Sequence, residues 1–167
     1  MDLTLRAGTA VDLPQLIDIY NHYVVNTTIT FDLAPVTLEQ RRVWLAQFAA
    51  VGRHQLLVAE AQGQLLGYAC SQQFRVKPAY DTTVELTCYC APGAAGRGIG
   101  TQLYTALFAA LASEDIHSYI AGIALPNDAS LVFHRKHGFV PAGTMHAVGR
   151  KFGSYWDVAF YERVVAQ

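Results

Sequence analysis

The chain has 167 residues, of which 52% are hydrophobic and only 15% are charged. A chain of this length and composition forms one domain with a sizeable core, so intrinsic disorder is excluded. Its 12 basic and 13 acidic residues give a formal net charge of -1. Because affinity for phosphate backbones depends on clustered Lys and Arg, this balance argues against a nucleic-acid partner.

The termini, the apolar runs and the cysteines favour the cytoplasm. The N-terminus lacks the basic start and apolar segment of a secretory signal, and no apolar run reaches the ~20 residues that cross a bilayer. Cys70, Cys88 and Cys90 are too few for a disulfide framework. We therefore expect a single cytoplasmic domain, residues 1–167, with no membrane partner.

A strand and a helix are predicted first. Leu3 and Leu5 alternate with polar neighbours, as in a short strand. Asp12, followed three residues later by Gln15, has the spacing of a capping box at a helix start. Apolar residues then recur with helical spacing until the polar, β-branched stretch 26–30, where we expect the helix to end.

A second helix and three strands follow. Thr37 with Gln40 forms another capping box and predicts a helix that continues towards residue 48. The apolar runs 55–61 and 65–73 flank Gln-Gly-Gln, which predicts a hairpin. Residues 82–90 are rich in Thr, Val and Tyr and predict a third strand.

The rest of the chain alternates helices and strands. A glycine-rich loop at 93–100 precedes a Leu-rich helix, and 118–123 is typical of a buried strand. Asn127 is placed to cap a short helix that ends at Gly138. Two closing strands, one from residue 139 and one over 156–164, complete the order.

The glycine-rich loop has two interpretations. Glycines between a strand and a helix let the backbone approach a phosphate, and they also occur in simple tight turns. Two standard phosphate motifs are absent. Ile99 stands where Walker A needs Lys, and Leu103 stands where the dinucleotide fingerprint needs its third glycine.

The segment Gly96-Arg97-Gly98-Ile99-Gly100 resembles the acetyl-coenzyme A loop of the GCN5-related N-acetyltransferase (GNAT) superfamily. Asn127-Asp128-Ala129-Ser130, with His134 and Gly138-Phe139 after it, is similar to the second cofactor segment of that superfamily. Further segments resemble its phosphinothricin N-acetyltransferase branch, which includes enzymes for methionine sulfoximine and methionine sulfone: Ile19-Tyr20-Asn21-His22-Tyr23, Thr30-Phe31, Ala79-Tyr80-Asp81, Glu85, Leu103-Tyr104, Leu125-Pro126-Asn127-Asp128 and Lys151-Phe152-Gly153.

The resemblance implies an α/β (α+β) fold with a mixed, mostly antiparallel sheet flanked by helices. It also implies acetyl-coenzyme A (acetyl-CoA) as co-substrate, held by Cys88, Tyr89, Cys90, Gly96, Arg97, Gly98, Ile99, Gly100, Thr101 and Asn127. The superfamily usually has Arg or Gln where this chain has Ala95. We expect backbone amides to supply the main pyrophosphate contacts, so this departure does not remove binding.

Glu85 and His134 are the candidate catalytic residues. Glu85 lies in an apolar strand, where burial would raise its pKa and make it a base, whereas an outward-facing Glu is the alternative. The resemblance gives His134 a catalytic role, whereas alone it reads as a cap or a surface group. Which proton each residue handles stays open. His137 makes His-x-x-His with His134, but without a third ligand we assign no metal.

The expected reaction is direct acetyl transfer, in a ternary complex, to the α-amine of a small amino-acid analogue. The resemblance places acceptor contacts at Phe31, Arg75, Val76 and Lys77, and an acidic analogue needs such cations. From the sequence alone, Arg75 and Lys77 are equally typical of a solvated loop. It also implies a homodimer. Two alternatives remain: an N-acetyltransferase for another small amine, and a non-catalytic acyl-CoA-binding sensor.

Overall fold

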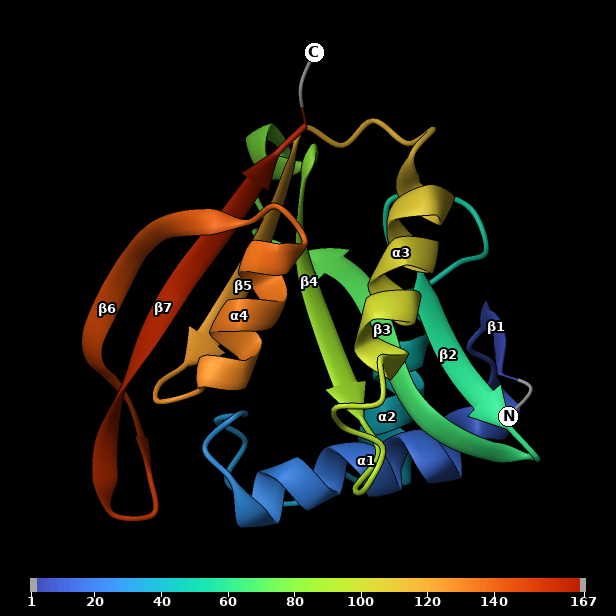
Figure 1. Cartoon of the computed structure of the whole chain (residues 1–167), viewed down its shortest axis with the longest axis horizontal. Coiled ribbons are helices and arrows are strands. Elements are labelled where there is room, and N and C mark those ends of the chain that lie inside the picture. The colour runs from blue at the N-terminus through green and yellow to red at the C-terminus, as the bar shows by residue number, and fades with distance from the viewer. Residues whose placement is uncertain (1–2, 166–167) are drawn as a thin grey trace.

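A seven-stranded sheet with helices on both faces forms the frame of the computed structural model, which describes residues 3–165 (Figure 1). In spatial order the strands are β1 (Thr4–Ala7), β2 (Leu56–Ala61), β3 (Gln64–Gln73), β4 (Thr83–Cys90), β5 (Ser118–Ala124), β7 (Ser154–Val164) and β6 (Val140–Lys151). All neighbouring pairs are antiparallel except β4 and β5, which are parallel. The predicted mixed, mostly antiparallel sheet is therefore confirmed.

Four α-helices cover this sheet: α1 (Leu13–Asn26), α2 (Leu38–Leu45), α3 (Ile99–Leu111) and α4 (Asp128–Lys136). In Figure 1, α3 and α4 lie in front of the sheet and α2 lies behind it. Two short 3₁₀ turns, η1 (Ala10–Asp12) and η2 (Pro78–Tyr80), complete the elements. The order of helices and strands predicted from the sequence is confirmed, with bounds that differ by a few residues.

Each face of the sheet has its own core. Under α3, the leucines at 103, 107 and 111 recur with helical spacing and are almost completely buried against Val84 and Leu86 of β4. On the opposite face, Leu16 and Ile19 of α1 pack on Val58 and Tyr68. Because successive strand residues point to opposite faces, β4 presents Leu86 and Cys88 to the first core and Glu85, Thr87 and Tyr89 to the second.

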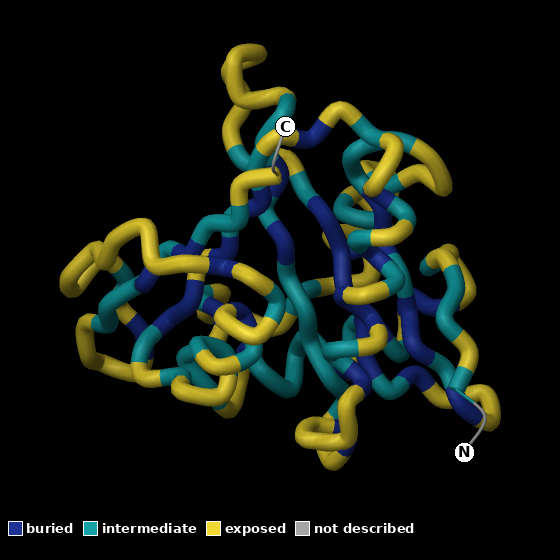
Figure 2. The backbone as a smooth tube through the Cα atoms, turned by 45° about the horizontal axis from the view of Figure 1, so that its top comes forward, coloured by how far each residue is buried: buried dark blue, intermediate teal, exposed yellow. Residues whose placement is uncertain are grey.

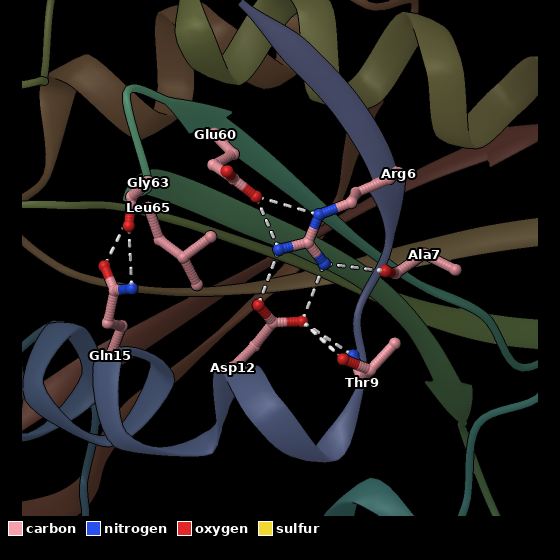
Figure 3. Close-up of polar contacts among 8 residues, drawn as sticks. All are labelled: Arg6, Ala7, Thr9, Asp12, Gln15, Glu60, Gly63 and Leu65. Atoms are coloured by element: carbon pink, nitrogen blue, oxygen red, sulfur yellow. Dashed lines mark hydrogen bonds and ion pairs between the residues drawn. The ribbon is translucent and has the colours of Figure 1, made fainter.

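Asp12 is the N-cap residue of α1, as predicted, but its side chain makes no capping bond to the helix. Its carboxylate accepts from Arg6 at 2.7 and 2.8 Å and from the Thr9 backbone N–H at 2.7 Å (Figure 3). Arg6 also donates to Glu60 of β2 at 2.6 Å. Charge-assisted bonds of this kind are stronger than a neutral cap, so the carboxylate ties β1 to α1 instead. The Arg6 guanidinium holds the pKa of Asp12 below its usual value.

Gln15 likewise does not form the predicted capping box. Its side-chain amide donates to the Gly63 carbonyl at 3.2 Å and accepts from the Leu65 N–H at 2.8 Å, which fastens α1 to the turn of the predicted hairpin (Figure 3). The second capping box is confirmed, because Thr37 and Gln40 exchange side chain-to-backbone bonds of 2.8 and 3.2 Å.

The strand β6 forms one edge of the sheet and is largely exposed along its length, in contrast to the buried centre (Figure 2). No helix among residues 3–165 combines the length and the apolar character needed to cross a membrane. The ends of the predicted domain, residues 1–2 and 166–167, lie outside the described residues.

Candidate active site

The central strands β4 and β5 separate after a short parallel pairing. They are in register only from Thr83–Glu85 to Ser118–Ile120. Beyond that point β4 continues along β3 and β5 continues along β7, so the two strands diverge, as Figure 1 shows. The edge of β4 from 86 to 90 is therefore unpaired on the β5 side, and alternate backbone N–H groups face the gap. A cavity of about 60 Å³ lies here, lined from both strands and from α4.

The glycine-rich loop leads from β4 into α3 as the sequence predicts. Gly96 and Gly98 have φ of +77° and +80°, and a Cβ at either position would meet no atom within 4 Å. Gly98 is the N-cap of α3, so the N–H groups of the first helical turn are left without intrahelical acceptors. An open loop of this conformation at a helix N-terminus fits the pyrophosphate of acetyl-CoA.

The other predicted loop residues contribute in different ways. The side chain of Ile99 is buried in the core, so only its backbone faces the loop. A Cβ at Gly100 would lie 3.2 Å from the Phe133 ring, so this glycine allows α3 to approach α4. Arg97 is exposed and Thr101 is half-buried. Ala94, which precedes the departure from the superfamily pattern at Ala95, is buried, which explains why a small apolar residue stands there.

The predicted cofactor residues of β4 fall on two faces. Cys88 and Cys90 pack beside the α3 core, whereas Tyr89 packs against Tyr20 and Tyr23 of α1. A hydrogen bond from the Cys88 thiol lowers the pKa of Cys90 to about 7, and that bond together with burial raises the pKa of Cys88. A thiol whose pKa is raised stays protonated and is a poor nucleophile.

Glu85 lies on β4 opposite Gln72 of β3, just where β4 and β5 begin to separate. Burial raises the pKa of its carboxyl group, and the positive charge of Arg75 partly opposes this shift. Its Oε1 is 3.6 Å from where a Cβ would stand at Gly122, a β5 residue that lines the small cavity. The carboxylate is therefore partly shielded from water at the edge of the gap.

His134 on α4 is 6% exposed and lines the same small cavity. Its Nδ1 lies 2.8 Å from the Ser130 carbonyl oxygen, and its Nε2 lies 3.1 Å from the Tyr104 hydroxyl. Because a carbonyl only accepts, Nδ1 carries the proton and Nε2 accepts from Tyr104. Burial lowers the pKa of His134, which keeps the imidazole neutral. Asn127 caps α4 through a 3.2 Å bond from the Ser130 N–H, as predicted, and also lines the cavity.

A larger cavity of about 280 Å³ lies on the opposite face of the sheet, below α1 and α2. It shares Thr87 and Tyr89 with the small cavity, and it includes Gln72, the cross-strand neighbour of Glu85. Glu85 and Thr87 point to this same face. The remaining lining residues are Tyr20, Asp32, Val36, Gln40, Arg41, Trp44 and Tyr68. Glu85 lines neither cavity, but it adjoins residues of both: its Oε1 lies near Gly122 of the small cavity, and its cross-strand neighbour Gln72 lines the larger one.

The predicted acceptor residues are only partly brought to Glu85. Arg75, Val76 and Lys77 are exposed in the segment after β3, where the Arg75 charge acts on Glu85. The Phe31 ring packs on Gly149 of β6, where a Cβ would lie 2.0 Å from the ring. Phe31 therefore lies against the hairpin formed by β6 and β7.

Apart from Tyr89, the sequence analysis assigned no role to the residues that line the larger cavity, and it assigned none to Tyr104. One signal was available: Arg41 falls at helical spacing with Leu45 and Phe48, on the inward face of α2. A basic residue in an apolar stripe is unusual, because charged side chains are seldom buried without a partner.

Comparison with known proteins agrees with this geometry. The sequence pattern of the family described as "Acetyltransferase (GNAT) domain" matches residues 5–160. The chain is 55% identical to a phosphinothricin N-acetyltransferase of Streptomyces coelicolor, covering 97% of this chain and 96% of the relative. It is 35% identical to an L-methionine sulfoximine/L-methionine sulfone acetyltransferase of Pseudomonas aeruginosa, covering 97% and 94%.

Among solved structures, a GNAT superfamily phosphinothricin acetyltransferase from Sinorhizobium meliloti, in complex with acetyl-CoA, superposes with a TM-score of 0.91 at 32% identity. The superposition covers 99% of this chain and 90% of that one.

Proposed function

This chain belongs to the GNAT acetyltransferase family and is an acetyl-CoA-dependent N-acetyltransferase, and we propose that its acceptor is the α-amine of a small amino-acid analogue of the phosphinothricin, methionine sulfoximine or methionine sulfone type. The relatives that carry these substrate names cover nearly the whole chain. The observation that carries the proposal is the position of Glu85, which lies beside Gly122 of the small cavity and opposite Gln72 of the larger one.

The glycine loop is proposed to bind the pyrophosphate of acetyl-CoA through the first backbone N–H groups of α3. The unpaired edge of β4 would hold the rest of the co-substrate, with Asn127 contributing from α4. The bound co-substrate supplies an acetyl thioester, and backbone N–H groups of β4 stabilise negative charge on the acetyl oxygen.

Glu85 acts as the general base. An α-amine is mostly protonated near neutral pH, so one proton must leave before nitrogen can attack. The raised pKa of Glu85 suits it to take that proton, directly or through water. A second proton leaves nitrogen when the amide bond forms. The unprotonated Nε2 of His134, once released from the Tyr104 hydroxyl that donates to it, can take this proton and return it to the departing thiolate.

Transfer is proposed to be direct, within a ternary complex. The thiol that lines the small cavity belongs to Cys88, and its raised pKa makes it unsuited to carry an acyl group. Arg75 and Lys77 would bring positive charge to the acceptor near Glu85, with Phe31 and Val76 as further contacts.

We also propose a location in the cell and an oligomeric state for this protein. The three cysteines are free thiols, which fits the cytoplasm, where disulfides are rare. A homodimer is proposed on the resemblance to the family, and light scattering of the purified protein tests it through the molar mass.

The proposed function is tested by thiol release from acetyl-CoA across a panel of amino acids and analogues. We expect release only when an acceptor is present, with phosphinothricin, methionine sulfoximine and methionine sulfone as the best acceptors. Tight acetyl-CoA binding without release would identify a sensor. Equal turnover with unrelated amines would replace the proposed acceptor class.

A further inference from the structure

Arg41 is buried in α2 without a carboxylate to balance its charge. It is 6% exposed, and no ion pair joins it to an acidic side chain within residues 3–165. Its Nη2 donates to the Tyr68 hydroxyl at 2.7 Å, whereas its buried Nε has no hydrogen-bond partner among the described residues. A buried charge with an unused donor is costly, so this arrangement indicates a ligand.

Arg6 provides a contrast within the same chain. Its guanidinium lies between the carboxylates of Asp12 and Glu60, at 2.7 and 2.6 Å, so its charge is neutralised inside the fold (Figure 3). Arg41 has aromatic rings in place of carboxylates: its Cζ is 3.6 Å from the ring centroid of Trp44 and 4.5 Å from that of Tyr20. Rings stabilise a cation but do not cancel its charge.

The larger cavity beside Arg41 has further donors. The side-chain oxygen of Gln72 accepts from the Trp44 indole N–H at 2.9 Å, which leaves the amide N–H groups of Gln72 for another acceptor. The acidic residue in the lining is Asp32, which is exposed and accepts from the Tyr20 hydroxyl at 2.7 Å. The cavity therefore offers donors and positive charge at Arg41, between aromatic walls.

The strand register places Arg41 away from Glu85 along the sheet. Glu85 lies opposite Gln72, and Tyr68, the partner of Arg41, lies four residues before Gln72 on the same strand. Four residues of strand span about 13 Å. Arg41 also stacks on Trp44, which bonds to Gln72, so its guanidinium lies between the two positions. An amine at Glu85 and a polar group at Arg41 would be the two ends of one small molecule.

We propose that the larger cavity is the subsite for the acceptor's side chain, in which Arg41 and Gln72 bind the oxygens of a tetrahedral phosphinate, sulfone or sulfoximine group. The rings of Tyr20, Trp44 and Tyr68 pack against the methylene and methyl groups of that side chain. The inference rests on the proposed function, because it needs an acceptor whose amine reaches Glu85. Arg41 is thereby a specificity residue, separate from Arg75 near the amine.

The test compares methionine sulfone with methionine, which has the same chain without the oxygens. In wild type we expect a clear preference in kcat/KM for the sulfone. Arg41→Gln should reduce this preference about tenfold to a hundredfold, the value of a charge-assisted hydrogen bond. Arg41→Lys should retain part of it. The matched control is Arg42→Gln, which removes the adjacent, exposed arginine of α2 and should leave the preference unchanged.

An unchanged preference in a folded Arg41→Gln protein overturns the subsite, while turnover of the sulfone by wild type still upholds the proposed function. Failure of wild type to acetylate any of these amino acids instead overturns the proposed function, and the subsite with it.

If Arg41→Gln does not fold, Trp156→Phe leaves Trp44 as the single tryptophan of the chain. Methionine sulfone should then change its fluorescence at a lower concentration than methionine. Equal responses, or none, contradict the subsite.

Discussion

The two faces of β4 carry sites of different construction. On the α3 face, the loop that fits a pyrophosphate is one continuous stretch of chain, 96–101. On the other face, the cavity around Arg41 is lined by residues of α1, α2, β3 and β4. The first site depends on backbone conformation and a helix N-terminus, so its signature is local. The second depends on side chains that meet only in the folded chain. A single strand therefore separates the proposed co-substrate site, built from backbone, from the proposed acceptor subsite, built from side chains.

Loss of Glu85, the proposed general base, should have the largest effect on turnover. Glu85→Gln keeps the shape but removes the base, so we expect kcat to fall by ~10²–10⁴-fold. Because burial raises the pKa of Glu85, wild-type kcat/KM should decrease as the pH falls through that raised value, and the variant should lose this dependence. A variant with wild-type turnover and an unchanged pH profile would show that another group is the base.

In the glycine loop, Gly98→Val should weaken acetyl-CoA binding by about tenfold to a hundredfold. The reason is that a β-branched residue disfavours the left-handed backbone conformation with which Gly98 begins α3. Calorimetry measures the affinity. Gly63→Val is the matched control, since Gly63 has φ of +75° and similarly open surroundings in the β2–β3 turn. Equal affinities in the two variants would remove the loop from the site.

Outside the larger cavity, Arg75→Ala removes the exposed cation whose charge acts on Glu85, and it should raise KM for phosphinothricin about tenfold, as expected for a lost charge-assisted bond. It should matter much less for a plain amine of similar size. Both substrates are measured on the same variant, because an equal rise for both would indicate a disturbed loop rather than lost recognition of charge.

The difference between the local loop and the cavity around Arg41 also explains which features of the fold could be predicted from the sequence. The glycine spacing of 96–100, the strand before it and the Leu-rich helix after it all lie within one short segment, so their arrangement follows from local rules. The capping boxes divide in the same way. Thr37 and Gln40 bond to each other as predicted, because α2 offers no stronger partner. The side chain of Asp12 does not cap α1, because it binds Arg6 instead. Arg6 is held in place by Glu60, which lies beside it only through the pairing of β1 with β2, and a local pattern cannot predict that pairing.

The acceptor side could be predicted only in outline. Arg75 was assigned because it stands just ahead of Glu85, but Arg41 is distant in sequence from both cavity strands. Its burial depends on the packing of α2 against Tyr68, which leaves no short motif, whereas its stacking on Trp44, three residues later in the same helix, is local but does not by itself indicate burial. A tertiary contact of this kind becomes visible only with the fold.

The smallest expected effect separates stability from selectivity within α2. Thr37→Ala removes the cap and should lower the free energy of unfolding by about 1 kcal/mol. Chemical denaturation measures this loss. The sulfone-to-methionine preference should remain, because the substitution removes only the bond from the Gln40 N–H to the Thr37 hydroxyl and keeps the backbone bond from the Arg41 N–H to the Thr37 carbonyl. A change in preference that followed the stability loss would mean that Arg41 acts only through the helix it belongs to.

A crystal structure with coenzyme A and phosphinothricin bound together tests the central claim most directly. We expect the pyrophosphate at the N-terminus of α3, the acceptor amine within one hydrogen bond or one water of Glu85, and the phosphinate on Arg41 in the larger cavity. Phosphinothricin bound elsewhere, with that cavity empty and Arg41 still enclosed by its rings, would contradict the division of the site by β4.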